Sequence, residues 1–274
     1  PYALPYAQLG GLPTRHPELP ILVMFLATYC TAWLYSLYIV VRCYQRSCNN
    51  RIAVVLLLAC GERITAYIMR IVWIFRISDI RIGIASQILL QAGVILVYVG
   101  ALLSAASLLR VHVKCLPWLT PFLITLSIVT IISFVANLVS TIVSVHTLQD
   151  HVRQTCRDVQ RVAATYLVFL TFISVLMLVV VFHVLWTRQK ISRISEAKTA
   201  GFIFSFVSIV CLLMASFKAG VIWKNPSPLF SPAWYLSLSS LYSFELGPEL
   251  LVTLILLGTS ARVGAQMRNA AVIH

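Results

Sequence analysis

Residues 52–75 read IAVVLLLACGERITAYIMRIVWIF, and this stretch decides the fold class. It has the length of a helix that crosses a membrane, which takes about 20 mostly apolar residues for roughly 30 Å of hydrocarbon. Glu62 and Arg63 nevertheless stand near its middle, and Arg70 follows two turns later. A charge at that depth costs on the order of 3 kcal/mol or more unless it meets a partner or a wet cavity. The stretch therefore predicts a membrane-spanning helix with a polar face turned toward other helices.

Six further apolar blocks approach the same length, and the chain as a whole is 60% hydrophobic and 11% charged. A soluble domain carries about 25% charged residues, so the excess apolar surface here must face lipid. We predict an all-α fold, a polytopic seven-transmembrane helix bundle over 19–262. A non-helical leader over 1–18 precedes it, and a cytoplasmic tail over 263–274 follows. The predicted helices cover 19–41, 52–75, 86–109, 121–143, 162–186, 200–222 and 233–258.

The net charge of +13 comes from Lys and Arg in short loops between the apolar blocks. That pattern favours membrane orientation and anionic lipid head groups, not nucleic acid. With the N-terminus outside, eleven Lys and Arg lie in cytoplasmic segments and seven in outer segments. We therefore predict a multi-pass protein of the plasma membrane or an endomembrane, with the N-terminus outside and the C-terminus in the cytoplasm.

The sequence motifs of several common reaction types are absent from this chain. It has no phosphate-binding Gly-rich loop, no GxSxG and no HExxH, which argues against ATP-driven transport within the chain and against two common hydrolase classes. Four potential metal ligands gather in a predicted outer loop, but their spacing matches no common zinc signature. We predict no metal site and no cofactor. The four are His146, Asp150, His151 and Cys156.

Polar side chains share one face on each of two predicted helices. Arg63, Tyr67 and Arg70 follow a helical spacing in 52–75, and Tyr242, Glu245 and Glu249 do so in 233–258. These two helices run in opposite directions, so their midpoints meet at one depth. We therefore predict that Arg63 or Arg70 lies within salt-bridge reach of Glu245 or Glu249.

Two features beside this cluster affect its geometry. Gly247-Pro248 predicts a kink, because Pro removes a backbone donor and clashes with the preceding turn. Lys218, near the outer end of the sixth helix, has two possible arrangements: its long side chain snorkels to the interface or joins the cluster.

The run at 241–251, LYSFELGPELL, resembles the last helix of the fungal lipid-translocating exporter family. That family includes resistance-to-aminocholesterol and sphingoid-base export proteins, and has the pattern Tyr-x-Phe-Asp-x-x-Pro followed by Leu-Leu. This chain carries Tyr242, Phe244, Glu245 and Pro248 at the corresponding positions. The resemblance extends either to this family or to a distant sister group of fungal seven-helix proteins.

Two further segments carry the same resemblance. The run at 66–70, AYIMR, is similar to the family's Gly-Tyr-Ile-x-Arg. Gln87 or Gln91, followed by small residues at 100–107 and by Arg110, resembles its third helix. The resemblance implies seven helices and the movement of lipid-like molecules across or out of a membrane.

The leading interpretation is a lipid translocator or efflux protein, which favours a function other than an enzyme's and leaves enzymatic activity open. Its partners are membrane lipids or a lipid-like small molecule, with no nucleic acid. A polar face on the second and seventh helices carries a charged head group while the tails stay in lipid. The candidate substrate-binding residues are Glu62, Arg63, Tyr67, Arg70, Gln91, Tyr242, Glu245 and Glu249.

An integral-membrane enzyme acting on a lipid-like substrate is the alternative. A terpene cyclase is its concrete form, in which a buried acid, Glu62 or Glu245, protonates the substrate and aromatic faces stabilise a cation. A seven-helix receptor is a third interpretation. Against it, the third helix ends Leu109-Arg110-Val111, and the seventh lacks Asn-Pro-x-x-Tyr. Cavity shape separates the first two: a lateral groove favours translocation, and a closed aromatic pocket favours an enzyme.

Overall fold

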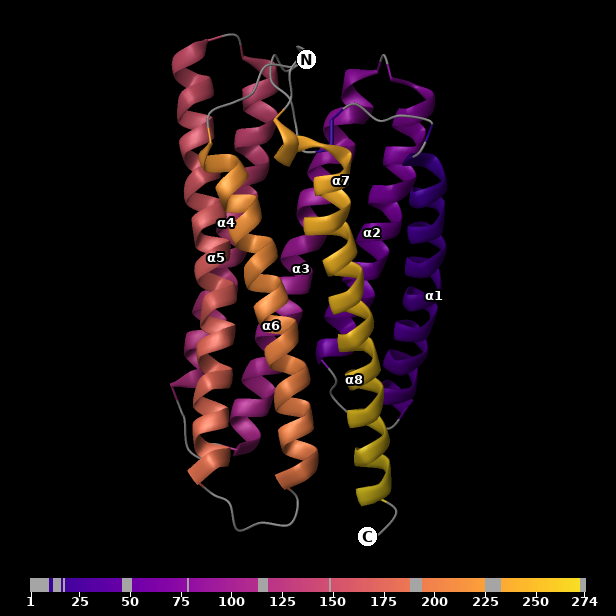
Figure 1. Cartoon of the computed structure of the whole chain (residues 1–274), viewed down its shortest axis with the longest axis vertical. Coiled ribbons are helices and arrows are strands. Elements are labelled where there is room, and N and C mark those ends of the chain that lie inside the picture. Colours follow the sequence, from indigo (N-terminus) through magenta and orange to yellow (C-terminus); the bar gives the residue numbers. More distant parts are fainter. Residues whose placement is uncertain are drawn as a thin grey trace.

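The computed structural model is an antiparallel bundle of long helices (Figure 1). It describes residues 10–11, 16, 18–45, 51–77, 79–112, 118–147, 149–187, 194–224 and 233–271. No strand occurs in these described segments. The elements are α1 (Glu18–Gln45), α2 (Arg51–Phe75), α3 (Ile80–His112), α4 (Leu119–His146), α5 (Asp150–Thr187), α6 (Ile194–Trp223), the short segments η1 (Trp234–Leu236), α7 (Leu238–Leu241) and η2 (Tyr242–Leu246), and α8 (Gly247–Ala271).

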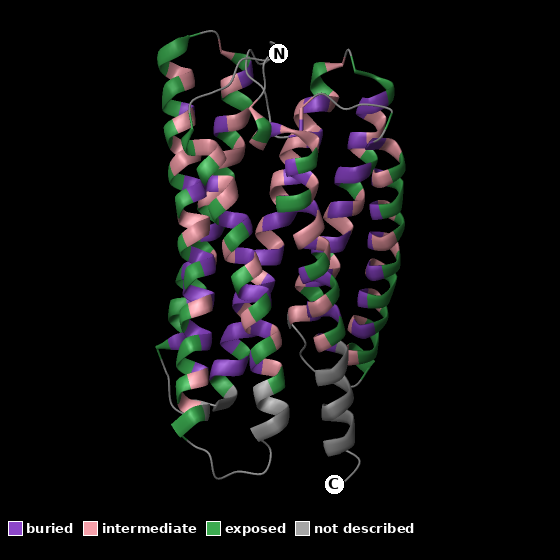
Figure 2. Ribbon diagram, in the orientation of Figure 1, coloured by how far each residue is buried: buried purple, intermediate pink, exposed green. Residues whose placement is uncertain are grey.

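Seven spans in this bundle are long and apolar enough to cross a membrane, with α7, η2 and α8 together forming the seventh. The prediction of an all-α seven-helix bundle is confirmed, and the chain has the features of a multi-pass membrane protein. Buried residues follow the inner faces of the helices (Figure 2), whereas many large apolar residues of α1, α4 and α5 are exposed. Outward Ile, Val and Leu are what a lipid-facing surface requires.

Helix α3 lies at the centre of the bundle and packs against α2, α4, α5, α6 and α8. Small residues on α3 permit this central position, because they let neighbouring backbones approach closely. Ala101 and Ala105 are almost completely buried there. Helix α8 lies against α1, α2, α3 and α6, so the two predicted polar helices, α2 and α8, are neighbours.

Helix α5 begins twelve residues before the predicted start at 162, and this prediction was wrong. The polar stretch from Asp150 continues the helix out of the apolar region. An ion pair between Arg161 and Asp158, one turn apart, supports it, and Arg153 Nε donates to the Thr147 carbonyl. All four residues that we placed in an outer loop therefore lie on helices: His146 ends α4, and the other three, from Asp150 to Cys156, belong to α5. At the other end of the chain, α8 continues to Ala271, into the predicted tail over 263–274.

The predicted disturbance at Gly247-Pro248 takes the form of a turn of π-helix, η2. The Gly247 N–H donates to the carbonyl of Tyr242, five residues earlier. Glycine is required at this position, because a Cβ atom would lie 2.7 Å from the Tyr242 oxygen. Such π turns interrupt α-helices at defined points, often beside functional groups. Here the turn includes Glu245.

Candidate functional site: a buried charge cluster beside a polar pocket

The centre of the bundle holds a buried ion pair between α2 and α8. Arg63 Nε and Nη2 donate to the two carboxylate oxygens of Glu249, so the pair is bidentate. Arg63 Nη1 donates to the Leu90 carbonyl on α3 at 3.0 Å. Both charged side chains are completely buried. The predicted contact between the polar faces of these two helices is therefore confirmed, and it fixes α2, α3 and α8 together.

Glu62 lies next to this pair but takes little part in it. Its Oε2 atom is 4.0 Å from Arg63 Nε, too far for a hydrogen bond. Both of its carboxylate oxygens are buried without a hydrogen-bond partner. Gly93 on α3 makes room for them, since a Cβ atom there would overlap Glu62 Oε2 and lie 2.6 Å from Arg63 Nε. The close approach of α3 to α2 thus depends on glycine at this position.

A second ion pair joins α6 to the π turn. Lys218 Nζ donates to Glu245 Oε1 at 2.9 Å, and both side chains are mostly buried. This pair lies close enough to Glu249 to interact with it electrostatically. Of the two arrangements open to Lys218, the structure shows the one in which it joins the cluster. We call the five residues the central charge cluster: Glu62, Arg63, Lys218, Glu245 and Glu249.

Arg70 is not part of the central charge cluster, contrary to one of the predicted possibilities. Its Nε donates to Glu18 at the start of α1, and its Nη2 lies 3.4 Å from the Gly10 carbonyl. Both charged side chains are fully buried. Two turns of α2 separate Arg70 from Arg63, about 10 Å along the helix. That distance places Arg70 near the end of the bundle where α1 begins.

Aromatic side chains fill the space between α1, α2 and the π turn. The ring of Tyr67 lies 5.5 Å from that of Tyr29 and 6.0 Å from that of Phe25. Phe25 also contacts Tyr242, at 5.8 Å between ring centres. The hydroxyl groups of Tyr67 and Tyr242 are buried without a hydrogen-bond partner. These two predicted site residues therefore both pack against Phe25.

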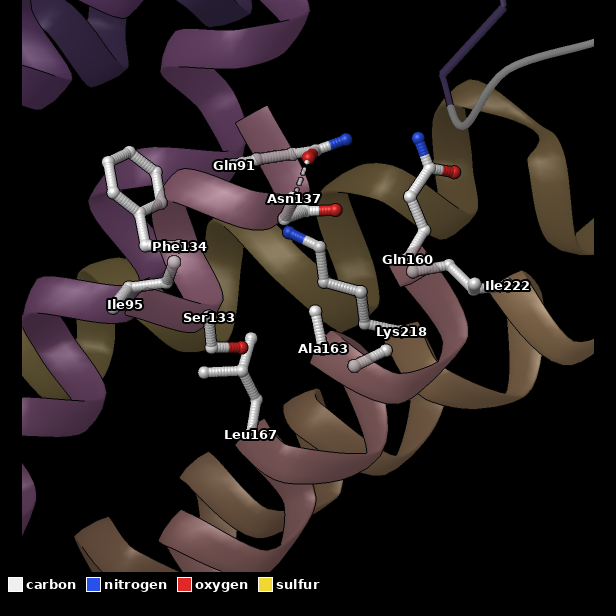
Figure 3. A pocket seen from close by; sticks show the side chains of 11 residues that line it. Gln91, Ile95, Ser133, Phe134, Asn137, Gln160, Ala163, Leu167, Lys218 and Ile222 are labelled. Carbon is white, nitrogen blue, oxygen red and sulfur yellow. Dashed lines mark hydrogen bonds between the residues drawn. The ribbon is translucent and has the colours of Figure 1, made fainter. Parts of the chain in front are cut away.

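A polar pocket lies between α3, α4, α5 and α6, and Lys218 lines it. Its internal space is about 20 Å³, room for about one water molecule, within about 350 Å³ that includes the open mouth, and six of its eleven lining residues are apolar. Figure 3 shows Gln91, Asn137 and Lys218 directed toward one another, and Asn137 Nδ2 donates to Gln91 Oε1 at 3.0 Å. Gln160 lines the same pocket and donates to Thr141 at 3.2 Å.

The structure divides the predicted site residues into three groups. Glu62, Arg63, Glu245 and Glu249 belong to the central charge cluster, together with Lys218. Tyr67, Arg70 and Tyr242 lie in the packed region toward α1. Gln91 alone lines the pocket. Sequence reasoning missed the other two pocket amides, Asn137 and Gln160. Asn137 could have been recognised as a candidate from its position in the apolar stretch of α4, because polar groups at that depth need partners.

Comparison of the chain with protein-family models, with curated proteins and with solved structures finds no match. The resemblance to the lipid-translocating exporters therefore stays a prediction that rests on the short motifs in α2, α3 and α8.

Proposed function

We propose that the chain binds the polar head group of an amphiphile in the pocket between α3, α4, α5 and α6, and carries it across the membrane. The observation that carries this proposal is the pocket itself. Three amide side chains and one ammonium group gather there, on a bundle that exposes many large apolar side chains. Such a lining binds a head group and leaves the hydrocarbon tail in the surrounding lipid.

The depth of the pocket supports this proposal. Asn137 lies nine residues before the end of α4, and Gln91 eleven residues after the start of α3. At about 1.5 Å per residue, both side chains lie roughly 13–17 Å from the same end of the bundle. A head group that enters from the interface at this end would reach the amides while its tail stays in hydrocarbon.

The chemistry of the lining favours a particular class of head group. Gln91, Asn137 and Gln160 offer both donors and acceptors, and the charge of Lys218 is balanced by Glu245. A site with no surplus charge suits hydroxyl, amide or amine groups better than a phosphate. The proposed substrates are therefore long-chain amines, amino alcohols or sterols with such groups.

The pocket is a poorer fit for the enzymatic alternative. A cyclase needs an acid and several aromatic faces around one cavity, whereas this lining contains one aromatic ring, Phe134, and no carboxylate. The rings of Tyr67 and Tyr242, near the central charge cluster, are packed against Phe25 and do not line this pocket. The pocket geometry thus supports binding and movement of an amphiphile over cyclisation.

The test uses the full chain in lipid vesicles, a fluorescent long-chain amine and a membrane-impermeant quencher. The double variant Gln91→Met/Asn137→Leu removes both partners of one hydrogen bond, so it leaves neither amide unpaired. We expect it to fold and to lose most of the acceleration of transbilayer movement. Gln154→Met, an exposed change six residues before Gln160 on α5, is the matched control. Native translocation by the double variant, or no acceleration by the native chain over protein-free vesicles, would refute the proposal.

A further inference from the structure

The central charge cluster is unbalanced. It contains three carboxyl groups, on Glu62, Glu245 and Glu249, but only two cationic groups, on Arg63 and Lys218. The other buried pair, Glu18 with Arg70, is balanced by itself. With every group ionised, the cluster would therefore hold one surplus negative charge in the middle of an apolar bundle.

Both cations of the cluster already form ion pairs with acids other than Glu62. Arg63 uses Nε and Nη2 for Glu249 and Nη1 for the Leu90 carbonyl. Lys218 donates to Glu245. The carboxyl group left over is that of Glu62, whose two buried oxygens have no hydrogen-bond partner. An unpaired carboxylate at this position would be strongly disfavoured, since transfer of an isolated charge out of water is far more costly than taking up a proton.

The surroundings of Glu62 offer it no further cation among the described residues. The charged groups within electrostatic reach are Arg63 on its own helix, Glu249 on α8 and Lys218 on α6. Helix α3 presents Gly93, whose missing side chain leaves space for the carboxyl group. On the α1 side, Trp33 approaches Gly61, the residue before Glu62. Gly93 therefore leaves space for the carboxyl group, and neither Gly93 nor Trp33 brings a charge to it.

We propose that Glu62 is a proton-binding site, which carries the proton that balances the central charge cluster. The Glu62 side chain is 14% exposed, whereas those of Arg63 and Glu249 are fully buried. This exposure belongs to the aliphatic part of the Glu62 side chain, because both of its carboxyl oxygens are buried. Loss of this proton leaves a carboxylate 4.0 Å from Arg63, which competes with Glu249 for the guanidinium group.

A metal cation is a poorer occupant than a proton. In the described part of the chain, no three His, Cys, Asp or Glu side chains gather as metal ligands would. Two of the three cluster acids also already accept hydrogen bonds from cations. A proton needs only one carboxyl oxygen and a small space, and Gly93 provides that space.

The test is modification of the native chain, in lipid nanodiscs at neutral pH, by an apolar carbodiimide, which reacts with protonated carboxyl groups in apolar surroundings. Peptide mapping by mass spectrometry then compares the acids of the cluster within one molecule. We expect the adduct on Glu62, little on Glu245 or Glu249, and loss of the adduct as the pH is raised. Infrared spectroscopy of the same sample should show the carbonyl stretch of a protonated acid. That band should disappear in Glu62→Gln and persist in Asp158→Asn, which changes an exposed acid on α5.

Three results would overturn the inference. One is an unmodified Glu62 under conditions in which the unfolded chain reacts. Another is modification mainly at Glu245 or Glu249. The third is suppression of the Glu62 adduct when sodium replaces choline at constant pH, since that would indicate a metal cation. If Glu62→Gln fails to accumulate, the peptide map and the infrared band of the native chain still decide the question. These measurements need no substrate, so their outcome is independent of the proposed translocation.

Discussion

Gly93→Ala tests whether the close approach of α3 to the charge cluster holds the bundle together. The new methyl group would overlap Glu62 Oε2 and lie 2.6 Å from Arg63 Nε and 2.8 Å from Arg63 Cζ. The Glu62 carboxyl group has no hydrogen-bond partner and can rotate away, but Arg63 is fixed by Glu249 and Leu90. Accommodation therefore requires α3 to move away or Arg63 to leave Glu249.

The expected change in the free energy of unfolding is the sum of two opposing contributions. Breaking a buried ion pair destabilises the fold by roughly 3–5 kcal/mol. Replacing a helical glycine by alanine stabilises the helix by about 1 kcal/mol. The net loss is about 2–4 kcal/mol, which corresponds to a melting temperature lower by on the order of 4–16 °C at about 2–4 °C per kcal/mol. Thermal unfolding of the purified chain in nanodiscs, followed by tryptophan fluorescence, measures the change.

Two glycines provide matched controls for this substitution. At Gly220 on α6 and Gly258 on α8, a new methyl group would meet no atom within 4 Å. Their replacement by alanine should leave the melting temperature unchanged or raise it slightly, since only the helix preference changes. A Gly93→Ala protein as stable as Gly220→Ala would refute the packing argument.

Three further predictions concern other parts of the bundle. Glu18→Gln should lower stability by roughly 3–5 kcal/mol, because it leaves the buried Arg70 without its carboxylate and Arg70 cannot give up its charge; thermal unfolding beside Asp158→Asn checks this. Gly247→Ala should cost about 1–3 kcal/mol by crowding the Tyr242 carbonyl in the π turn, and an unchanged melting temperature would contradict it. For orientation, a cysteine that replaces Gln154 should react with a membrane-impermeant maleimide added outside the cell. Reaction only after the membrane is opened would show that the N-terminus is inside. The native Cys156 cannot serve as the probe, because it is buried.

The fold was predictable because the membrane imposes it. A helix that crosses hydrocarbon needs about 20 apolar residues, and the lengths of the blocks reveal this directly. The ends of the helices were less predictable, since polar residues continue a helix once it leaves the apolar region. Helix α5 illustrates this: its first twelve residues are mostly polar, yet they are held by local contacts such as that between Arg161 and Asp158.

The pairing of Arg63 with Glu249 was predictable because antiparallel helices place their midpoints at one depth. The partner of Arg70 was not, because Glu18 comes from the start of α1, and nothing in its spacing indicates which helix α1 contacts. The pocket amides were missed for a related reason. Asn137 is a single amide in the apolar stretch of α4, and Gln160 precedes the predicted start of the fifth helix at 162, so only the packing of α4 and α5 against α3 brings them to Gln91.

Lys218 belongs both to the polar pocket and to the central charge cluster. A head group that accepts a hydrogen bond in the pocket competes with Glu245 for its ammonium group. Any weakening of that pair makes the surroundings of Glu62 and Glu249 more negative, so Glu62 holds its proton more tightly. Conversely, loss of the proton draws Arg63 toward Glu62 and away from Glu249. The two proposals are therefore coupled through one side chain, since whatever occupies the pocket changes the charge balance that the proton at Glu62 restores.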